Sequence, residues 1–202
     1  MYLSDSVAKT EPQNTRRQPI DERFLKLQPN VIVITHAHGD HFDAETLKHY
    51  LTEESGINFL SPRSAWIKAR EFKGNNNYVL FNEGTEWTDG NIVIKAVKAE
   101  HSDEFAIGVI LSAEGKNYFF TGDTLYNKKV IDSVKGIDIY AIFLPVNGRG
   151  NNMNKADAVK FFKGVKAKYM VPVHIGMFDD ISADDIPVKN KIIPTIYQEI
   201  KF

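Results

Sequence analysis

The sequence contains no cysteine in its 202 residues. Disulfides and thiolate metal ligands are therefore excluded, and a metal ion would have to be bound by histidine, aspartate or glutamate. Long apolar runs are also missing, because stretches such as VIVI and IYAIFLPV fall far short of the ~20 residues that a membrane-spanning helix needs. The N-terminal residues show no apolar core behind a basic start, as an export signal would require. These absences predict a cytoplasmic protein with no membrane partner.

The chain also lacks a strong charge of either sign. It has 25 Lys and Arg against 26 Asp and Glu, so no bulk basic field favours nucleic acid as a partner. Its basic clusters are NTRRQP (residues 14–19) and KGVKAKY (163–169), and such lysines are routine on solvated faces. A hydrophobic fraction of 43% suits an ordinary globular core. We expect one domain over residues 1–202, with nucleic acid disfavoured.

Hydrophobic periodicity predicts strands and helices that alternate at both ends of the chain. A helix is expected over Asp43 to Ser55, with Asp43 as its N-cap. The other expected helices cover 62–72 and 155–165. Strands are expected over 30–36, 57–62, 91–102, 105–113, 116–124, 139–146 and 167–174. Because helices flank a central block of strands, the order predicts a layered α/β fold rather than a bundle or a sandwich.

Three of the six histidines lie in THAHGDH (residues 35–41). Histidine and aspartate are poor core fillers, and a buried polar group without a partner costs free energy. A chance occurrence of this pattern is on the order of one in a few thousand for this composition. A bound cation would explain the crowding. We expect Gly39 to permit the tight turn, whereas His49 is interpreted as an ordinary helix residue.

Further polar residues follow other expected strands at their C-terminal ends, where α/β sheets place their ligands. Together with the first cluster they give five imidazoles and two carboxylates: His36, His38, Asp40, His41, His101, Asp123 and His174. This set could hold one or two divalent cations, with a carboxylate shared between them. Imidazole and carboxylate suit Zn, Mn or Fe. We expect Mn or Zn.

THAHGDH, together with EHS (100–102), TGDT (121–124) and PVH (172–174), resembles the metallo-β-lactamase superfamily, whose motifs line a hydrolytic site with one or two metals. The resemblance implies a four-layer αββα fold. It assigns His36, His38 and His101 to the first metal. It assigns Asp40, His41 and His174 to the second, with Asp123 as the bridge.

Four longer segments are similar to the L-ascorbate-6-phosphate lactonase-like branch: YLSDS (2–6), HSDEFAIGVIL (101–111), TGDTLYN (121–127) and residues 152–178. Members of that branch usually begin with a strand pair ahead of a YLSDS-like segment. We therefore expect this chain to lack its first two strands. All seven candidate ligands lie beyond that region. By resemblance, a homo-oligomer is also expected.

The resemblance implies a metal-dependent hydrolase that opens a small lactone or ester, with a sugar-phosphate lactone such as L-ascorbate 6-phosphate as one candidate. Asp40 would also take or orient a proton. The alternatives are a phosphodiesterase or nuclease, and an inactive or regulatory protein that binds metal. Candidate substrate contacts are Arg149, Asn152, Tyr126 and Lys128. The loop NGRGNNMN could instead be a plain loop in which Asn154 caps the next helix. Candidate partners for the imidazoles are Glu100, Ser102 and Thr124.

Overall fold

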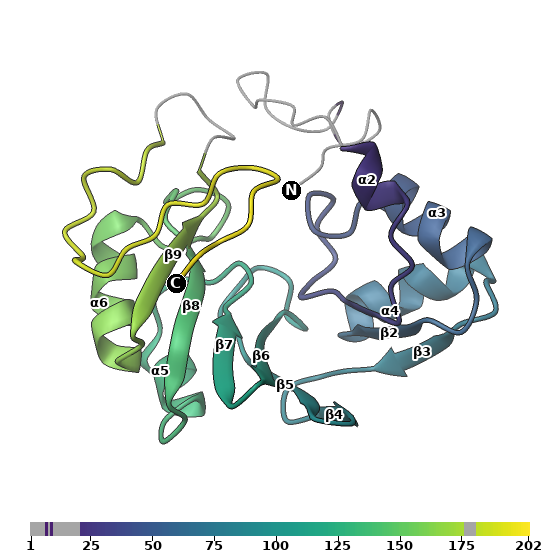
Figure 1. Ribbon diagram of the computed structural model, residues 1–202, viewed down its shortest axis with the longest axis horizontal. Helices are drawn as coiled ribbons and strands as arrows, with labels where there is room; N and C mark the ends of the chain where they lie inside the picture. Colours follow the sequence, from purple (N-terminus) through teal and green to yellow (C-terminus); the bar gives the residue numbers. More distant parts are fainter. Residues whose placement is uncertain (1–6, 8, 10–20, 176–180) are drawn as a thin grey trace.

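The computed structural model describes residues 7, 9, 21–175 and 181–202 of the chain (Figure 1). The predictions that concern YLSDS, NTRRQP and the end of the segment 152–178 fall partly or wholly outside these residues. Within the described part of the chain, no helix has both the length and the apolarity needed to cross a membrane.

A small parallel sheet forms one half of the molecule. Its three strands are ordered β1 (Val31–Val33), β2 (Asn58–Ser61) and β3 (Asn77–Leu80). Its helical elements are α2 (Glu22–Leu25), α3 (Ala44–Glu53), α4 (Arg63–Ala69) and the 3-10 helix η1 (Arg70–Phe72). Figure 1 shows α3 and α4 on the outer side of this sheet.

A larger mixed sheet forms the other half. Its six strands are ordered β4 (Glu86–Asp89), β5 (Ile92–Lys98), β6 (Ile107–Ala113), β7 (Lys116–Phe120), β8 (Ile139–Pro145) and β9 (Tyr169–Val173). The pairs from β4 to β7 are antiparallel, and β7 to β9 are parallel. Its outer helices are α5 (Lys128–Ser133) and α6 (Lys155–Val165) (Figure 1).

Alternating side chains produce the layers, because successive residues of a strand point to opposite faces. On β2, Phe59 packs in the cluster that contains Leu51 of α3. The next residue, Leu60, packs in the cluster that contains β5 and β6 side chains. On β6, Val109 belongs to this same inner cluster, whereas Ile110 faces α5 and α6. The order is therefore helices, sheet, sheet, helices, and the expected αββα fold is confirmed.

The predicted N-cap residues mark the observed starts of two helices. Asp43 caps α3 by accepting a hydrogen bond from the Glu45 N–H, and Asn154 caps α6 in the same way through Asp157. Helix α6 has the predicted bounds. The turn between β6 and β7 has positive φ at Glu114 (52°) and Gly115 (72°), which is typical of a tight hairpin.

Some elements were not predicted. Strands β3 and β4 and helices α2 and α5 were missed. In both of these strands every side chain is exposed or only half-buried, so neither carries a clear apolar pattern. The first strand is also shorter than the predicted 30–36, because pairing ends at Val33. The remaining residues of that run enter the loop that carries the first histidines.

Candidate metal centre

The loops that carry the candidate ligands all leave the C-terminal ends of strands. His36 follows β1, His101 follows β5, Asp123 follows β7 and His174 directly follows β9. Strand ends of neighbouring segments meet at one edge of an α/β core, where rigid strands support the loops. The four loops therefore bring side chains from distant parts of the sequence to one place.

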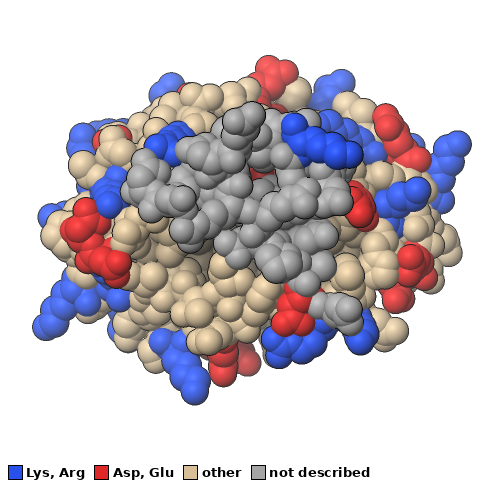
Figure 2. All heavy atoms as spheres, turned by 90° about the horizontal axis from the view of Figure 1, so that it is seen from above, with Lys and Arg blue, Asp and Glu red and all other residues tan. Residues whose placement is uncertain are grey.

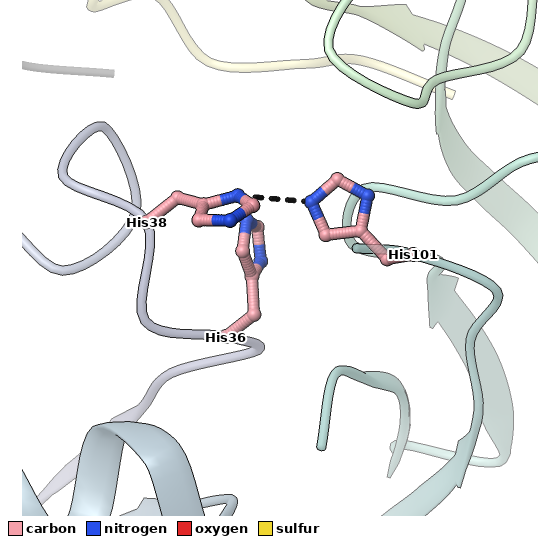
Figure 3. A group of neighbouring side chains, drawn as sticks. All are labelled: His36, His38 and His101. Atoms are coloured by element: carbon pink, nitrogen blue, oxygen red, sulfur yellow. Dashed lines mark hydrogen bonds between the residues drawn. The ribbon is translucent and has the colours of Figure 1, made fainter. Parts of the chain in front are cut away.

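One group consists of His36, His38 and His101, each of which offers a ring nitrogen within 4.8 Å of the others. Figure 3 shows the three rings turned toward a common point. Nε2 of His101 lies 3.0 Å from Nδ1 of His38. His36 is fully buried, and its Nε2 has no hydrogen-bond partner among the residues that the structure describes.

The second group consists of Asp40, His41, Asp123 and His174. Oδ1 of Asp123 lies 2.8 Å from Nε2 of His174 and 3.1 Å from Nε2 of His41. Despite these short distances, no contact of this oxygen with the described part of the chain has hydrogen-bond geometry. The rings of His36 and His41 have centroids 4.1 Å apart, so the two groups adjoin.

These distances are compatible with ligands that share a cation as well as with hydrogen bonds. Two tetrahedral ligands at a metal distance of ~2.0–2.1 Å stand about 3.3 Å apart. The facing nitrogens are 3.0 Å apart in the first group and 3.2 Å apart in the second. A buried polar atom without a partner costs about 1–3 kcal/mol. A cation in each group would give the unpartnered atoms of His36 and Asp123 their missing partner.

The other ring nitrogens are held by neighbours that the sequence did not indicate. Nδ1 of His36 contacts the Thr35 hydroxyl at 3.1 Å, and Nδ1 of His101 contacts the Asn151 carbonyl at 3.3 Å. The prediction that Glu100, Ser102 and Thr124 would do this was wrong within the described residues: Glu100 accepts from Asn127, and Thr124 from the Glu100 N–H. The ring of His36 is held by its sequence neighbour Thr35, whereas the ring of His101 is held by a residue 50 positions away.

Asn147 contacts the ring nitrogen of His174 that points away from the second group. Its Nδ2 lies 3.5 Å from Nδ1 of His174, while its own Oδ1 is buried without a partner among the described residues. Turning the amide by 180° would let that oxygen accept the Nδ1 proton, since amide orientation is assigned from the network. The lone pair of Nε2 would then face the site. His174 itself has φ of 60°, an uncommon conformation for a residue other than glycine.

Asn152 holds the shared carboxylate. Its Nδ2 donates to Oδ2 of Asp123 at 2.8 Å, and its Oδ1 accepts from the Thr124 N–H at 3.1 Å. The side chain is buried, and both ends of its amide are engaged. The sequence predicted Asn152 as a substrate contact. The structure places it behind Asp123, where it orients that carboxylate.

Electrostatics differ between the two groups. Burial, with a smaller contribution from positive charge on nearby His41, lowers the pKa of His36 to about 2. Burial likewise lowers the pKa of His101. Burial would lower the pKa of His41 too, but the close carboxylate of Asp123, 3.1 Å away, outweighs it and raises the His41 pKa. Burial would raise the pKa of Asp123, yet the imidazoles of His174 and His41, 2.8 and 3.1 Å from its Oδ1, hold that pKa well below its usual range.

We therefore expect acid to release the cation of the Asp40 group first. A metal binds neutral imidazole, so a proton competes wherever the pKa is high. His41, whose pKa is raised, takes up its proton at a higher pH than His36 and His101, whose pKa values are lowered. Zinc content measured on dialysis between pH 8 and 5 should fall in two steps. A single step that involves both cations would contradict this order.

The turn in THAHGDH does not need a glycine at position 39, contrary to the prediction. Gly39 has no positive φ, and an added Cβ would meet Val7 at an ordinary 3.5 Å. The turn closes through hydrogen bonds from the His41 and Phe42 amides to the His38 carbonyl. The glycine that geometry requires is Gly122 of TGDT, with φ of 60° and a Cβ that would come within 2.9 Å of a carbonyl oxygen.

The other predicted substrate contacts lie at different distances from the centre. Arg149 lies at the exposed tip of the loop 147–154, which reaches His101 through Asn151. Tyr126 packs edge-on against Phe161, with Lys160 over its ring at 4.2 Å. Lys128 is exposed at the first turn of α5, and His49 bonds Leu25 and Glu53 away from both groups.

Comparison with known proteins bears on this centre. The family model described as a beta-lactamase superfamily domain matches residues 3–175, a range that contains all seven candidate ligands. A UPF0173 metal-dependent hydrolase of Thermoplasma volcanium is 30% identical over 81% of this chain and 74% of its own length. One from Carboxydothermus hydrogenoformans is 27% identical over 91% and 80%. An isothiocyanate hydrolase from Delia radicum gut bacteria shares the fold, with a TM-score of 0.71 over 91% of this chain and 80% of that one at 16% identity.

Proposed function

This chain belongs to the beta-lactamase superfamily domain family and to the UPF0173 metal-dependent hydrolases, and from that premise we propose that it opens a small lactone or ester. As a member it is a metal-dependent hydrolase; the substrate class is our proposal. The convergence of seven histidine and aspartate side chains in two adjoining groups supports metal-dependent hydrolysis, and the choice of a lactone rests on the resemblance of the sequence to the lactonase-like branch.

In this proposal each of the two groups binds one cation. His36, His38 and His101 would hold one cation, and Asp40, His41 and His174 the other, with Asp123 between them. Such cations supply a water acidified to a pKa near 7 and a Lewis acid that polarises a carbonyl oxygen. The unpartnered nitrogen of His36 and oxygen of Asp123 support this assignment. Zinc and manganese are the proposed ions, because the donors are imidazole and carboxylate.

Asp40 is the proposed proton acceptor. Its Oδ2 lies 3.6 Å from Nε2 of His41, and its side chain retains 16% of its exposure, against 7% for Asp123. Asp40 is therefore the more accessible carboxylate of the group. A carboxylate at this place can orient the attacking water and take its proton. The buried Asp123 is held by Asn152 and suits a fixed role.

A phosphorylated lactone, such as one derived from L-ascorbate 6-phosphate, would need an anion site beside the cations. The loop 147–154 lies beside His101, and three of its residues have positive φ: Gly148, Gly150 and Asn151. Such backbone conformations can turn N–H groups toward an anion. Arg149 lies between the glycines and can pair with phosphate oxygens.

We expect Arg149→Gln to raise KM for a phosphorylated lactone about tenfold, since one charge-assisted contact is worth about 1.5–3 kcal/mol when buried and less at an exposed loop. The kcat should hardly change, and a neutral lactone should be hydrolysed as before. Steady-state kinetics on a matched pair of lactones tests this. Equal losses on both substrates would remove Arg149 from substrate recognition.

The substrate class is tested by comparing a panel of lactones and esters with a chromogenic phosphodiester under zinc or manganese. Turnover of lactones that a chelator abolishes supports the proposal. Robust phosphodiester turnover with none on lactones would favour a phosphodiesterase or nuclease. Among described residues on the face in Figure 2, basic and acidic side chains are interspersed, which does not favour a nucleic-acid surface. Metal binding without any turnover would favour a regulatory protein.

A further inference from the structure

We propose that two charged side chains, Asp103 and Lys68, position the metal ligands by holding the backbone of Ala37. Ala37 is the buried residue between His36 and His38. Neither charged side chain belongs to the two ligand groups. The inference rests on the metal centre proposed above and extends it from the ligands to the groups that orient them.

Asp103 holds one side of Ala37. Its Oδ2 accepts the Ala37 N–H at 2.9 Å and the Ser64 hydroxyl at 2.6 Å. Its Oδ1 accepts the Phe105 N–H at 3.0 Å, which fixes the loop that follows β5. One carboxylate therefore joins helix α4, the first histidine loop and the loop of His101, which lies two residues before Asp103.

Lys68 holds the other side. This residue of α4 donates from Nζ to the Ala37 carbonyl at 2.9 Å. Its ammonium group also lies 5.7 Å from the ring centroid of Phe42, within the range of a cation–π contact. Both polar groups of Ala37 are thus bonded to a charged side chain, and charge-assisted hydrogen bonds are stronger than neutral ones.

The two bonds act on different peptide planes. The N–H of Ala37 belongs to the peptide that joins it to His36, and its carbonyl belongs to the peptide that joins it to His38. Because peptide groups are planar, holding both planes fixes φ and ψ of Ala37. These angles set the relative direction of the two flanking imidazoles. Asp103 also positions the third ligand of the group, His101, because its hydrogen bond to the Phe105 N–H fixes the loop that carries this histidine.

The test compares Asp103→Asn with Glu104→Gln. Both remove one negative charge from the same loop, and Glu104 is exposed, with no hydrogen bond among the described residues. Affinities for Zn²⁺ and Co²⁺ are measured by chelator competition, together with the Co²⁺ absorption spectrum. We expect Asp103→Asn to weaken one cation about 10- to 100-fold and to change the spectrum. The affinity of Asp103→Asn for the other cation should equal that of the wild type, and Glu104→Gln should keep wild-type affinities for both cations and a wild-type spectrum.

A second test uses Lys68→Met, and its control is Lys48→Met, which makes the same change at an exposed residue of α3. Lys68→Met should weaken the same cation, and combining it with Asp103→Asn should cost less than the sum, because both act on one residue. Should Asp103→Asn fail to fold, Lys68→Met decides the matter. Wild-type affinity and spectrum in the folded variants would overturn the inference, as would an equal loss in Glu104→Gln. A wild-type protein that binds neither cation would instead refute the metal centre itself.

Discussion

Replacing Asp123 with asparagine should lower kcat/KM on a lactone by about 10³-fold or more and release one cation per chain. The carboxylate lies between His174 and His41, with Oδ1 2.8 and 3.1 Å from their Nε2 atoms. An amide of the same size keeps an oxygen there but loses the negative charge. Cations contribute several kcal/mol to transition-state stabilisation, and each 1.36 kcal/mol is tenfold in rate. Metal analysis and steady-state kinetics on one preparation measure both effects.

The matched control is Asp138→Asn, which makes the same chemical change at an exposed site. It should leave metal content and kinetics at the wild-type level. If Asp123 served only as an ion-pair partner for the two histidines, its substitution would lower the melting temperature of the chelated protein without changing metal content. Asn152→Ala should act in the same direction with a smaller loss, about 10- to 100-fold, because it removes the partner of Oδ2 and the acceptor of the Thr124 N–H but keeps the charge of Asp123.

Removing the metals should lower the melting temperature by roughly 10 °C for each cation. A ligand at 1,000 times its dissociation constant stabilises the folded state by ~4 kcal/mol. For a chain of about 200 residues, each kcal/mol corresponds to roughly 2–4 °C. Without cations, the unpartnered atoms of His36 and Asp123 stay buried. Thermal denaturation with and without a chelator measures the shift.

Two histidine variants make this result specific. His38 belongs to the first group, whereas His49, a residue of α3, contacts Leu25 and Glu53 and lies outside both groups. The chelator shift should shrink in His38→Gln and persist in His49→Gln. A shift that is equal in both variants would mean that the stabilising cation is bound elsewhere. No shift in the wild type would deny the cations a role in stability.

The ligand groups could be predicted from the sequence because their signals are local. THAHGDH concentrates unusual residues in seven positions, and the other candidates follow strands that are apolar enough to recognise. The structure brings all seven together in two adjoining groups, with Asp123 in the group of Asp40, His41 and His174; the expected division between two metals came from the family resemblance. That they bind metal remains a proposal, and metal identity, oligomeric state and cellular location remain predictions.

The supporting shell could not be predicted, because it joins residues that are distant in the chain. Asp103 reaches Ala37 across 66 positions, and Lys68 reaches it across 31. Both bonds end on backbone atoms, which leave no trace in the identity of Ala37. The partner of the His101 imidazole was missed for the same reason, because the Asn151 carbonyl lies 50 positions along the chain; Thr35, the partner of His36, is a direct neighbour. Strands β3 and β4 were missed because their side chains are largely exposed.

The central claim is that these seven side chains hold divalent cations, and elemental analysis of protein purified without added metal tests it most directly. The account predicts between one and two equivalents of zinc, manganese or iron per chain. It also predicts that His38→Gln and Asp123→Asn each lose about one equivalent. A protein that stays free of metal even after dialysis against zinc and manganese would contradict the assignment of all seven residues.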